Sequence, residues 1–130
     1  MFYDGDCGLC NRSIQFLRQR DRCEVLYFAP IQGETARQCL SADLRTTLST
    51  VIYQRPSPNG QPKILLRSEA VLCALIDTQS SWSWLAICVR CLPCTWRDAT
   101  YHWIATNRHR FGGKPSCPLP TPREHSHFLP

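Results

Sequence analysis

Two cysteines near the start of the chain have the spacing of a redox pair. Cys7 and Cys10 are separated by Gly8 and Leu9, directly after a short apolar segment and at the start of a segment with helical periodicity. In the first turn of a helix, cysteines three residues apart lie close enough to form a disulfide, and the free amides and the dipole stabilise a thiolate at the first. The spacing therefore predicts that Cys7 attacks a disulfide. Cys10, on the apolar face, is expected to stay protonated until it resolves the mixed disulfide.

Two carboxylates precede this pair. Asp4 and Asp6 stand in the turn that leads to Cys7. We expect Asp6 to cap the helix by accepting a backbone N–H. Asp4, at the end of the preceding apolar segment, is expected to accept the proton of Cys10 when Cys10 resolves the mixed disulfide.

The remaining cysteines allow several interpretations. The chain has 9 cysteines in 130 residues, whereas a secreted disulfide scaffold is normally shorter, richer in cysteine and even in cysteine number. Cys91 and Cys94 form a second CxxC, but Pro93 interrupts the helical pattern and no strand precedes it, so we interpret Cys88, Cys91 and Cys94 as structural or incidental. Three alternatives stay open. In the first, Cys88, Cys91 and Cys94 form a second redox or metal-binding group. In the other two, the pair Cys7 and Cys10 is half of a metal site, or consists of two ordinary buried thiols.

The elements that must position Cys7 and Cys10 follow from the hydrophobic periodicity. They are a strand at 2–3, a helix at 7–20, a doubly covered strand at 25–29, a weak helix at 34–48, strands at 50–53 and 64–66, and a helix at 69–77. Asn59-Gly60 is typical of a hairpin between the last two strands, and Ser68 is expected to cap the last helix. The order β-α-β-α-β-β-α predicts an α/β domain with a thioredoxin-like fold.

The second half of the chain predicts a helical C-terminal extension. An apolar helix is expected at 82–92, forming core or a lid, and a second helix at 98–110, ended by Gly112-Gly113. Residues 114–130 are rich in proline and are expected to be extended or disordered. The domain prediction is therefore residues 1–113 as the thioredoxin-like domain, including the helices from about 82, followed by a tail at 114–130. The four histidines have no ligand spacing near a cysteine pair and are interpreted as surface residues.

Charge and hydrophobicity exclude several classes of protein. Fifteen Lys and Arg against ten Asp and Glu give a net charge of +5, short of the basic footprint of a nucleic-acid-binding protein. No stretch reaches the roughly 18 apolar residues of a membrane span, and membrane association is not expected. The first six residues lack the basic start and apolar run of an export signal. We therefore expect a cytoplasmic protein with mostly reduced thiols.

The chain resembles the DCC family of thiol-disulfide oxidoreductases, which is named for an Asp-x-x-Cys-x-x-Cys core. The resemblance is carried by residues 4–11 (DGDCGLCN), Arg20-Asp21, 28–32 (FAPIQ), 68–70 (SEA), Arg97-Asp98, Tyr101, 104–108 (IA-x-NR), Gly112 and Cys117. It covers essentially the whole chain. It implies a thioredoxin-like fold, Cys7 and Cys10 as the redox pair, and disulfide reductase or exchange activity. The role of Cys117 stays open.

The combined prediction is a thiol-disulfide oxidoreductase of the protein-disulfide reductase type, with Cys7, Cys10 and Asp4 as catalytic residues. No prosthetic group and no metal are expected, because an external thiol or reductase supplies the electrons. The expected partners are a disulfide-containing protein or small thiol as substrate, and a reductase or glutathione as electron donor. The alternative function is a non-enzymatic, thiol-rich module that binds a metal or a partner protein.

The substrate class is also open at this stage. Thioredoxins place a cis-proline before the strand opposite the CxxC, where it shapes peptide binding. This chain has Leu48-Ser49-Thr50-Val51 at that point. Protein disulfides are therefore expected to be the poorer substrates, and a small thiol such as glutathione is the alternative.

Overall fold

The computed structural model of the protein describes residues 1–46, 50–108, 110 and 127–130. Its elements are β1 (Phe2–Tyr3), α1 (Gly8–Arg20), β2 (Ala29–Pro30), α2 (Glu34–Cys39), α3 (Ala42–Thr46), β3 (Ile52–Arg55), β4 (Lys63–Leu66), α4 (Arg67–Asp77), α5 (Ser83–Arg90) and α6 (Cys94–Thr106). The predicted order of elements is confirmed, with the weak second helix divided into α2 and α3. The architecture is mixed α/β and compatible with a thioredoxin-like fold, and α5 and α6 form the helical extension.

The four strands form one mixed sheet in the order β2-β1-β3-β4. β1 pairs in parallel with β2 and antiparallel with β3, and β3 pairs antiparallel with β4. The predicted hairpin is confirmed. Gly60 in its loop has a φ of +77°, in the left-handed region where glycine carries no steric penalty.

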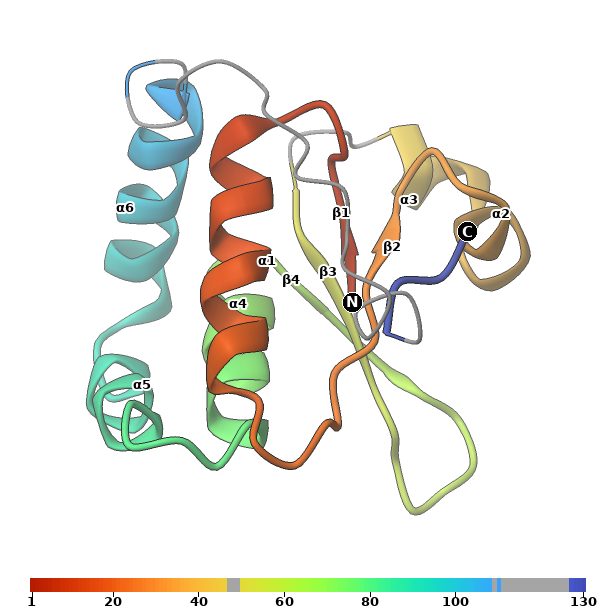
Figure 1. Ribbon diagram of the computed structural model, residues 1–130. Helices are drawn as coiled ribbons and strands as arrows, with labels where there is room; N and C mark the ends of the chain where they lie inside the picture. The colour runs from red at the N-terminus through yellow and green to blue at the C-terminus, as the bar shows by residue number, and fades with distance from the viewer. Residues whose placement is uncertain (47–49, 109, 111–126) are drawn as a thin grey trace.

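The sheet separates two hydrophobic cores, because neighbouring residues of a strand point to opposite faces. Tyr3 and Tyr53 belong to the core shared with α1 and α4, whereas Phe2 and Ile52 belong to the core shared with α2. The first core also contains Ile14, Leu17, Leu65, Ala70 and Ala74. Figure 1 shows the resulting layers: α1 and α4 lie on one side of the sheet, α2 and α3 on the other, and α5 and α6 beyond α1 and α4.

The predicted strand after α1 differs from the expectation. Leu26 and Phe28 are buried, but Val25 and Tyr27 are 46% and 49% exposed, so the segment is covered on one face and not on both. β2 begins only at the last residue of the predicted strand. The physical reason is local, because the amides of Val25 and Leu26 donate to the carboxylate of Asp21, at 3.2 and 2.7 Å, instead of to a neighbouring strand.

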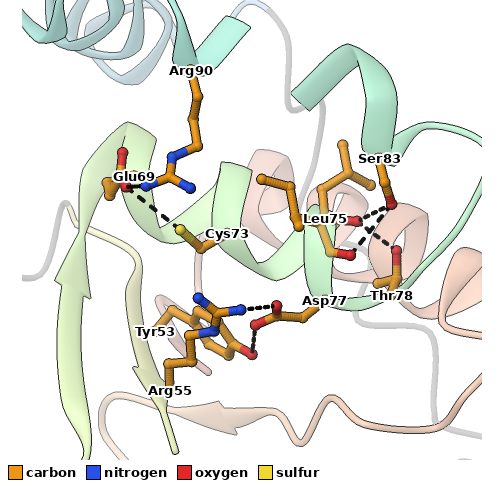
Figure 2. Close-up of polar contacts among 10 residues, drawn as sticks. Tyr53, Arg55, Glu69, Cys73, Leu75, Asp77, Thr78, Ser83 and Arg90 are labelled. Atoms are coloured by element: carbon orange, nitrogen blue, oxygen red, sulfur yellow. Dashed lines mark hydrogen bonds and ion pairs between the residues drawn. The ribbon is translucent and has the colours of Figure 1, made fainter. Parts of the chain in front are cut away.

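Side-chain contacts fix α4 to the sheet and to α5. Asp77 accepts a hydrogen bond from the Tyr53 hydroxyl at 2.8 Å and forms an ion pair with Arg55 at 2.6 Å, both from β3. Glu69, at the other end of α4, forms an ion pair with Arg90 of α5 at 2.8 Å (Figure 2). β3, α4 and α5 are therefore held as one unit, against which α6 can dock.

α6 docks onto the start of α4 through polar contacts. Arg97 donates to Glu69 at 2.7 Å, and the Ser68 hydroxyl donates to Asp98. The prediction that Ser68 caps α4 is wrong, because the N-cap residue is Leu66 and Ser68 already lies within the helix. The hydroxyl that was expected to bind its own helix instead binds a neighbouring one.

The outer face of the extension is apolar and exposed. Trp84, Ile87 and Trp96 are 65%, 52% and 70% exposed. Of the two alternatives for residues 82–92, core or a lid, core is wrong for most of them, although Ala86 is buried. α6 begins at Cys94, earlier than the predicted residue 98, and the predicted end at 112–113 lies outside the described residues. No described helix is long and apolar enough to cross a membrane.

Residues 127–130 lie alongside the segment that leads into β2. The Phe28 amide donates to His127, and the Leu129 amide donates to Phe28, both at 2.8 Å. The rings of Phe28 and Phe128 are 5.7 Å apart. His127 lies 3.2 Å from the Leu26 carbonyl and its side chain is 12% exposed, so it is not the surface residue that was predicted. Residues 114–126 of the predicted tail are outside the described residues.

Candidate active site

Cys7 is the residue at which α1 begins. It is the N-cap, with φ −93° and ψ 111°, and its sulfur accepts a hydrogen bond from the Cys10 amide at 3.4 Å. The prediction that Asp6 caps this helix is wrong, because the sulfur takes the place of the carboxylate. An amide that points at sulfur at the positive end of a helix dipole stabilises a thiolate there.

The turn before α1 is fixed by hydrogen bonds to its backbone. The Cys7 amide donates to the Asp4 carbonyl at 3.2 Å, and the Asn11 side chain donates to the Gly5 carbonyl at 3.1 Å. Cys7 itself is 7% exposed. Strand β1, being buried on both faces, ends at this turn, so the sheet and the helix together determine where the Cys7 sulfur lies.

Cys10 lies one turn into the helix, in a different environment. It packs against the core that contains Ile14 and Leu17, as its place on the apolar face predicted. Burial, the hydrogen bond with Cys7, and the charges of Cys7 and Asp4 raise the pKa of the Cys10 thiol to about 12, while a hydrogen bond with the Asp4 backbone acts in the opposite direction. Cys10 is therefore protonated at neutral pH.

Asp4 is held by three groups from different parts of the chain. Its carboxylate accepts hydrogen bonds from the Asp6 amide at 3.1 Å and from the Gln32 side chain at 3.0 Å, and it lies 3.6 Å from the Arg108 guanidinium. The Gln32 side chain also accepts from the Gly5 amide at 3.4 Å. Asp4 is thus kept close enough to Cys10 for its charge to act on that thiol.

Tyr101 brings α6 to the same site. Its hydroxyl accepts a hydrogen bond from the Val51 amide at 3.1 Å. Burial raises the pKa of Tyr101 above its ordinary value, the hydrogen bond with the Val51 backbone acts in the opposite direction, and the charges of Cys10 and Cys7 add to the rise. The phenol therefore lies within electrostatic reach of both thiols, although it comes from the helical extension.

The structure thus brings Cys7, Cys10 and Asp4 together, as the sequence predicted. Sequence reasoning did not propose Gln32, Tyr101 or Arg108 as site residues. Each of them stands in a segment that carried the family resemblance, and that was the available signal. The spacing of Gln32, Tyr101 and Arg108 along the chain does not indicate that they share a site, because their contacts depend on how β2 and α6 fold back toward α1.

The second CxxC has no comparable setting. Cys91 is the C-cap of α5 and Cys94 is the first residue of α6, with Pro93 between them as the N-cap of α6. Cys88, Cys91 and Cys94 are all exposed, and the eight cysteines of the described ranges are free thiols. Within those ranges, no group of three or more His, Cys, Asp or Glu is placed to hold a metal ion. Cys117 is outside the described residues.

One protein family and two known relatives are similar to this chain over most of its length. Residues 1–114 match the family described as DCC1-like thiol-disulfide oxidoreductase. The chain is 30% identical over 131 residues to "Uncharacterized protein YuxK" of Bacillus subtilis (strain 168), covering 100% of this chain and 93% of that protein. It is also 30% identical over 122 residues to "DCC family protein At1g52590, chloroplastic" of Arabidopsis thaliana, covering 92% of this chain and 68% of the relative. No solved structure matches it.

Proposed function

Because this chain belongs to the DCC1-like thiol-disulfide oxidoreductase family, we propose that it reduces and exchanges disulfides through Cys7 and Cys10. The observation that supports this most directly is the 3.4 Å hydrogen bond from the Cys10 amide to the Cys7 sulfur. It stabilises negative charge on Cys7, while the raised pKa of Cys10 keeps the second thiol protonated. The two thiols thus have the different properties that attack and resolution require.

The reaction has two exchange steps. The Cys7 thiolate attacks one sulfur of a substrate disulfide, forms a mixed disulfide, and releases the other sulfur as a thiolate, which takes up a proton. Cys10 then loses its proton and attacks the Cys7 sulfur, which releases the second substrate thiolate. The substrate gains two electrons, and Cys7 and Cys10 lose two electrons as their disulfide forms.

The proton of Cys10 needs an acceptor in the second step. Asp4 is the acceptor that we propose, since its charge already acts on the Cys10 thiol. The hydrogen bond from Gln32 and the ion pair with Arg108 hold the carboxylate in place between turnovers. A positioned base of this kind typically accelerates a proton transfer by about 100-fold or more.

The same chemistry determines the other reactants. Both electrons reside on sulfur, so we propose that no prosthetic group takes part. An external thiol or a reductase, such as glutathione or a dithiol donor, regenerates the reduced pair. Disulfide-containing proteins and small disulfides are the candidate substrates. We further propose a reducing, cytoplasmic location.

The test is dithiothreitol-driven reduction of one protein disulfide and one small disulfide by the metal-free protein. We expect the wild type to accelerate at least one of them, and Cys7→Ser to abolish that acceleration. The double variant Cys91→Ser/Cys94→Ser is the matched control, since it removes the exposed second CxxC, and it is expected to keep the activity. If the metal-free wild type reduces both disulfides only at the background rate, and the protein binds a metal stoichiometrically, the result would instead favour a thiol-rich binding module.

A further inference from the structure

All 4 tryptophans of the chain lie in the helical extension, and all of them are exposed. Trp82 and Trp84 stand at the start of α5, and Trp96 and Trp103 in α6. They are 42%, 65%, 70% and 59% exposed, in that order. Single exposed apolar residues are normal on a protein surface, but a group of large ones marks a contact surface.

Helix α6 has its polar side chains inward and its indoles outward. Arg97 and Asp98 bind the start of α4. Trp96 and Trp103, two helical turns apart, lie on one outer stripe. A helix on the surface of a globular protein normally has the opposite arrangement, with its apolar stripe toward the core. The outer stripe of α6 therefore indicates contact with an apolar partner.

Helix α5 has an outer stripe of the same kind. Trp84, Ile87, Cys88 and Cys91 follow the spacing of one helix face, and all of them are exposed, whereas Ala86 is buried. Figure 1 shows α5 and α6 on the same side of the molecule, beyond α1 and α4. The tryptophan face of this side consists of Trp82, Trp84, Ile87, Leu92, Trp96 and Trp103.

The helices on this side of the sheet also carry an excess of positive charge. α1 and α5 contain no Asp or Glu, and the carboxylate of Asp98 in α6 accepts a hydrogen bond from Ser68. In α4, Glu69 is shared by two guanidinium groups. By contrast, α2 and α3 on the other side of the sheet each carry one acidic and one basic residue. The arginines of α1, α5 and α6 are Arg12, Arg18, Arg20, Arg90 and Arg97.

Arg20 places this positive charge at the edge of the tryptophan face. Its guanidinium carbon lies 3.6 Å from the centroid of the Phe16 ring and 5.4 Å from that of the Trp82 ring. Indoles favour the headgroup level of a bilayer, and arginines near the surface are attracted to anionic lipids. A second copy of this chain would instead bring like charges together, which is unfavourable. The charge thus favours an anionic lipid surface as the occupant of this face.

We propose that the tryptophan face is a peripheral docking surface for anionic lipid membranes, on which α5 and α6 lie flat. The indoles enter the boundary between headgroups and acyl chains, so no described helix needs to be long enough to span the bilayer. This inference goes beyond the proposed function, because it uses no residue of the cysteine pair and concerns where the protein docks.

The experiment is sedimentation of the full chain with vesicles, in dithiothreitol so that the exposed cysteines stay reduced. Vesicles of phosphatidylcholine with about 30% phosphatidylglycerol are compared with vesicles of phosphatidylcholine alone. The wild type is expected to bind the anionic vesicles about tenfold more tightly, and to lose this preference as salt is added. Trp84→Ser/Trp96→Ser is expected to weaken binding to the anionic vesicles by about tenfold or more. Arg20→Gln is expected to weaken it by about fivefold.

The matched control is Ile64→Ser. Ile64 is 43% exposed and points away from α4, because its neighbour Leu65 belongs to the core shared with that helix. This variant is expected to bind the anionic vesicles like the wild type. Both tryptophans removed in the double variant are exposed, so its far-UV circular dichroism is expected to match that of the wild type.

Several results would overturn the inference. They are a wild type that does not sediment with anionic vesicles, one that binds neutral and anionic vesicles equally, and a loss of binding in Ile64→Ser as large as that in the tryptophan variant. A wild type that stays off the vesicles but is a dimer, which Trp84→Ser/Trp96→Ser converts to a monomer, would assign the face to a second copy. Reduction of disulfides by Cys7 is measured without lipid, so the proposed function stands or falls separately.

Discussion

The Arg108 guanidinium lies 3.6 Å from the Asp4 carboxylate, which joins the end of the helical extension to the turn before the cysteine pair. The same carboxylate accepts a hydrogen bond from Gln32, after β2. Asp4 is 13% exposed, so its negative charge is partly removed from water and is balanced by these partners. Its charge is one of the causes that raise the pKa of Cys10.

Asp4→Asn is expected to slow the resolving step selectively. The attack by Cys7 does not need this carboxylate, whereas the second step needs an acceptor for the Cys10 proton. Rapid mixing with an aromatic disulfide that releases a coloured thiolate separates the two steps as two phases. The first phase is expected to keep its rate, and the second to slow by about 100-fold.

The control for this variant is Asp6→Asn. It removes one negative charge from the same turn, from an exposed carboxylate, and leaves Asp4 and its partners in place. Both phases are expected to keep their rates in Asp6→Asn. If Asp4→Asn resolves its mixed disulfide as fast as the wild type, Asp4 does not accept the proton.

The raised pKa of Cys10 predicts how its reactivity depends on pH. A raised pKa leaves less thiolate at neutral pH and moves the plateau of alkylation to higher pH. In Cys7→Ser the contributions from the Cys7 thiol are lost, but burial is the largest cause, so the pKa of Cys10 is expected to stay above that of an ordinary thiol. Alkylation by iodoacetamide, followed on the Cys10 peptide by mass spectrometry, is expected to rise about tenfold per pH unit from neutral pH.

Free N-acetylcysteine is the reference for this measurement, because it levels off near an ordinary thiol pKa of about 8.5. A Cys10 peptide whose alkylation levels off at the same pH as the reference would show that the folded chain does not protect the thiol. The experiment is independent of catalysis and can be done without a substrate.

Glu69→Gln is expected to destabilise the fold, because one carboxylate serves both Arg90 and Arg97. Arg97 is 11% exposed, so removal of its partner leaves a poorly hydrated charge, at a cost of about 2 kcal/mol. The matched control is Glu34→Gln. In the wild type Glu34 forms an ion pair with Arg37, and the two side chains are 61% and 63% exposed. Loss of this exposed pair is expected to cost less than about 0.5 kcal/mol. Equal midpoints for the two variants in urea unfolding would contradict the prediction.

The same carboxylate predicts part of the acid sensitivity. The hydrogen bond from Arg97 lowers the pKa of Glu69 below its ordinary value of 4.5, against the effect of burial. A lowered pKa in the folded state gives stability that is present above the unfolded value and is lost as the pH falls. The wild type is therefore expected to lose more stability than Glu69→Gln between about pH 5 and pH 3 in thermal melts.

Phe128→Ala is expected to destabilise the sheet by about 2 kcal/mol, because the Phe128 ring packs on Phe28 and on the first core. Leu129→Ala removes a neighbouring side chain that is 38% exposed and is expected to cost less than about 1 kcal/mol. Equilibrium unfolding of both variants tests this. A change in Phe128→Ala no larger than that in Leu129→Ala would show that the ring contact adds nothing to stability.

Features that depend on neighbouring residues were predictable from the sequence. The hairpin follows from Asn59-Gly60 between two β-rich runs, and the start of α1 follows from the helical spacing of Cys10, Ile14 and Leu17. These signals are local, because a turn or an amphipathic helix face involves residues close in the chain. The placement of Cys7 at a helix N-terminus was therefore predictable as well.

Features that depend on particular side-chain hydrogen bonds or on distant residues were not predictable from the sequence. The segment before β2 has a β-rich composition, but the Asp21 carboxylate binds two of its amides, and no periodicity reveals such a bond. The exposure of Trp84 and Trp96 is set by what packs on α5 and α6, which the apolar pattern does not state. The contacts of Tyr101 and Arg108 at the site likewise depend on how α6 folds back.

The pairing of residues 127–130 with the segment before β2 has a consequence for the way the chain reaches its fold. His127 and Leu26 are 101 residues apart in sequence, so this edge can be completed only after residue 127 has been synthesised. Closing so large a loop carries a high entropic cost, and contacts of long sequence separation slow folding. We expect the edge to form last during folding, after the hairpin and the helices that pack on it.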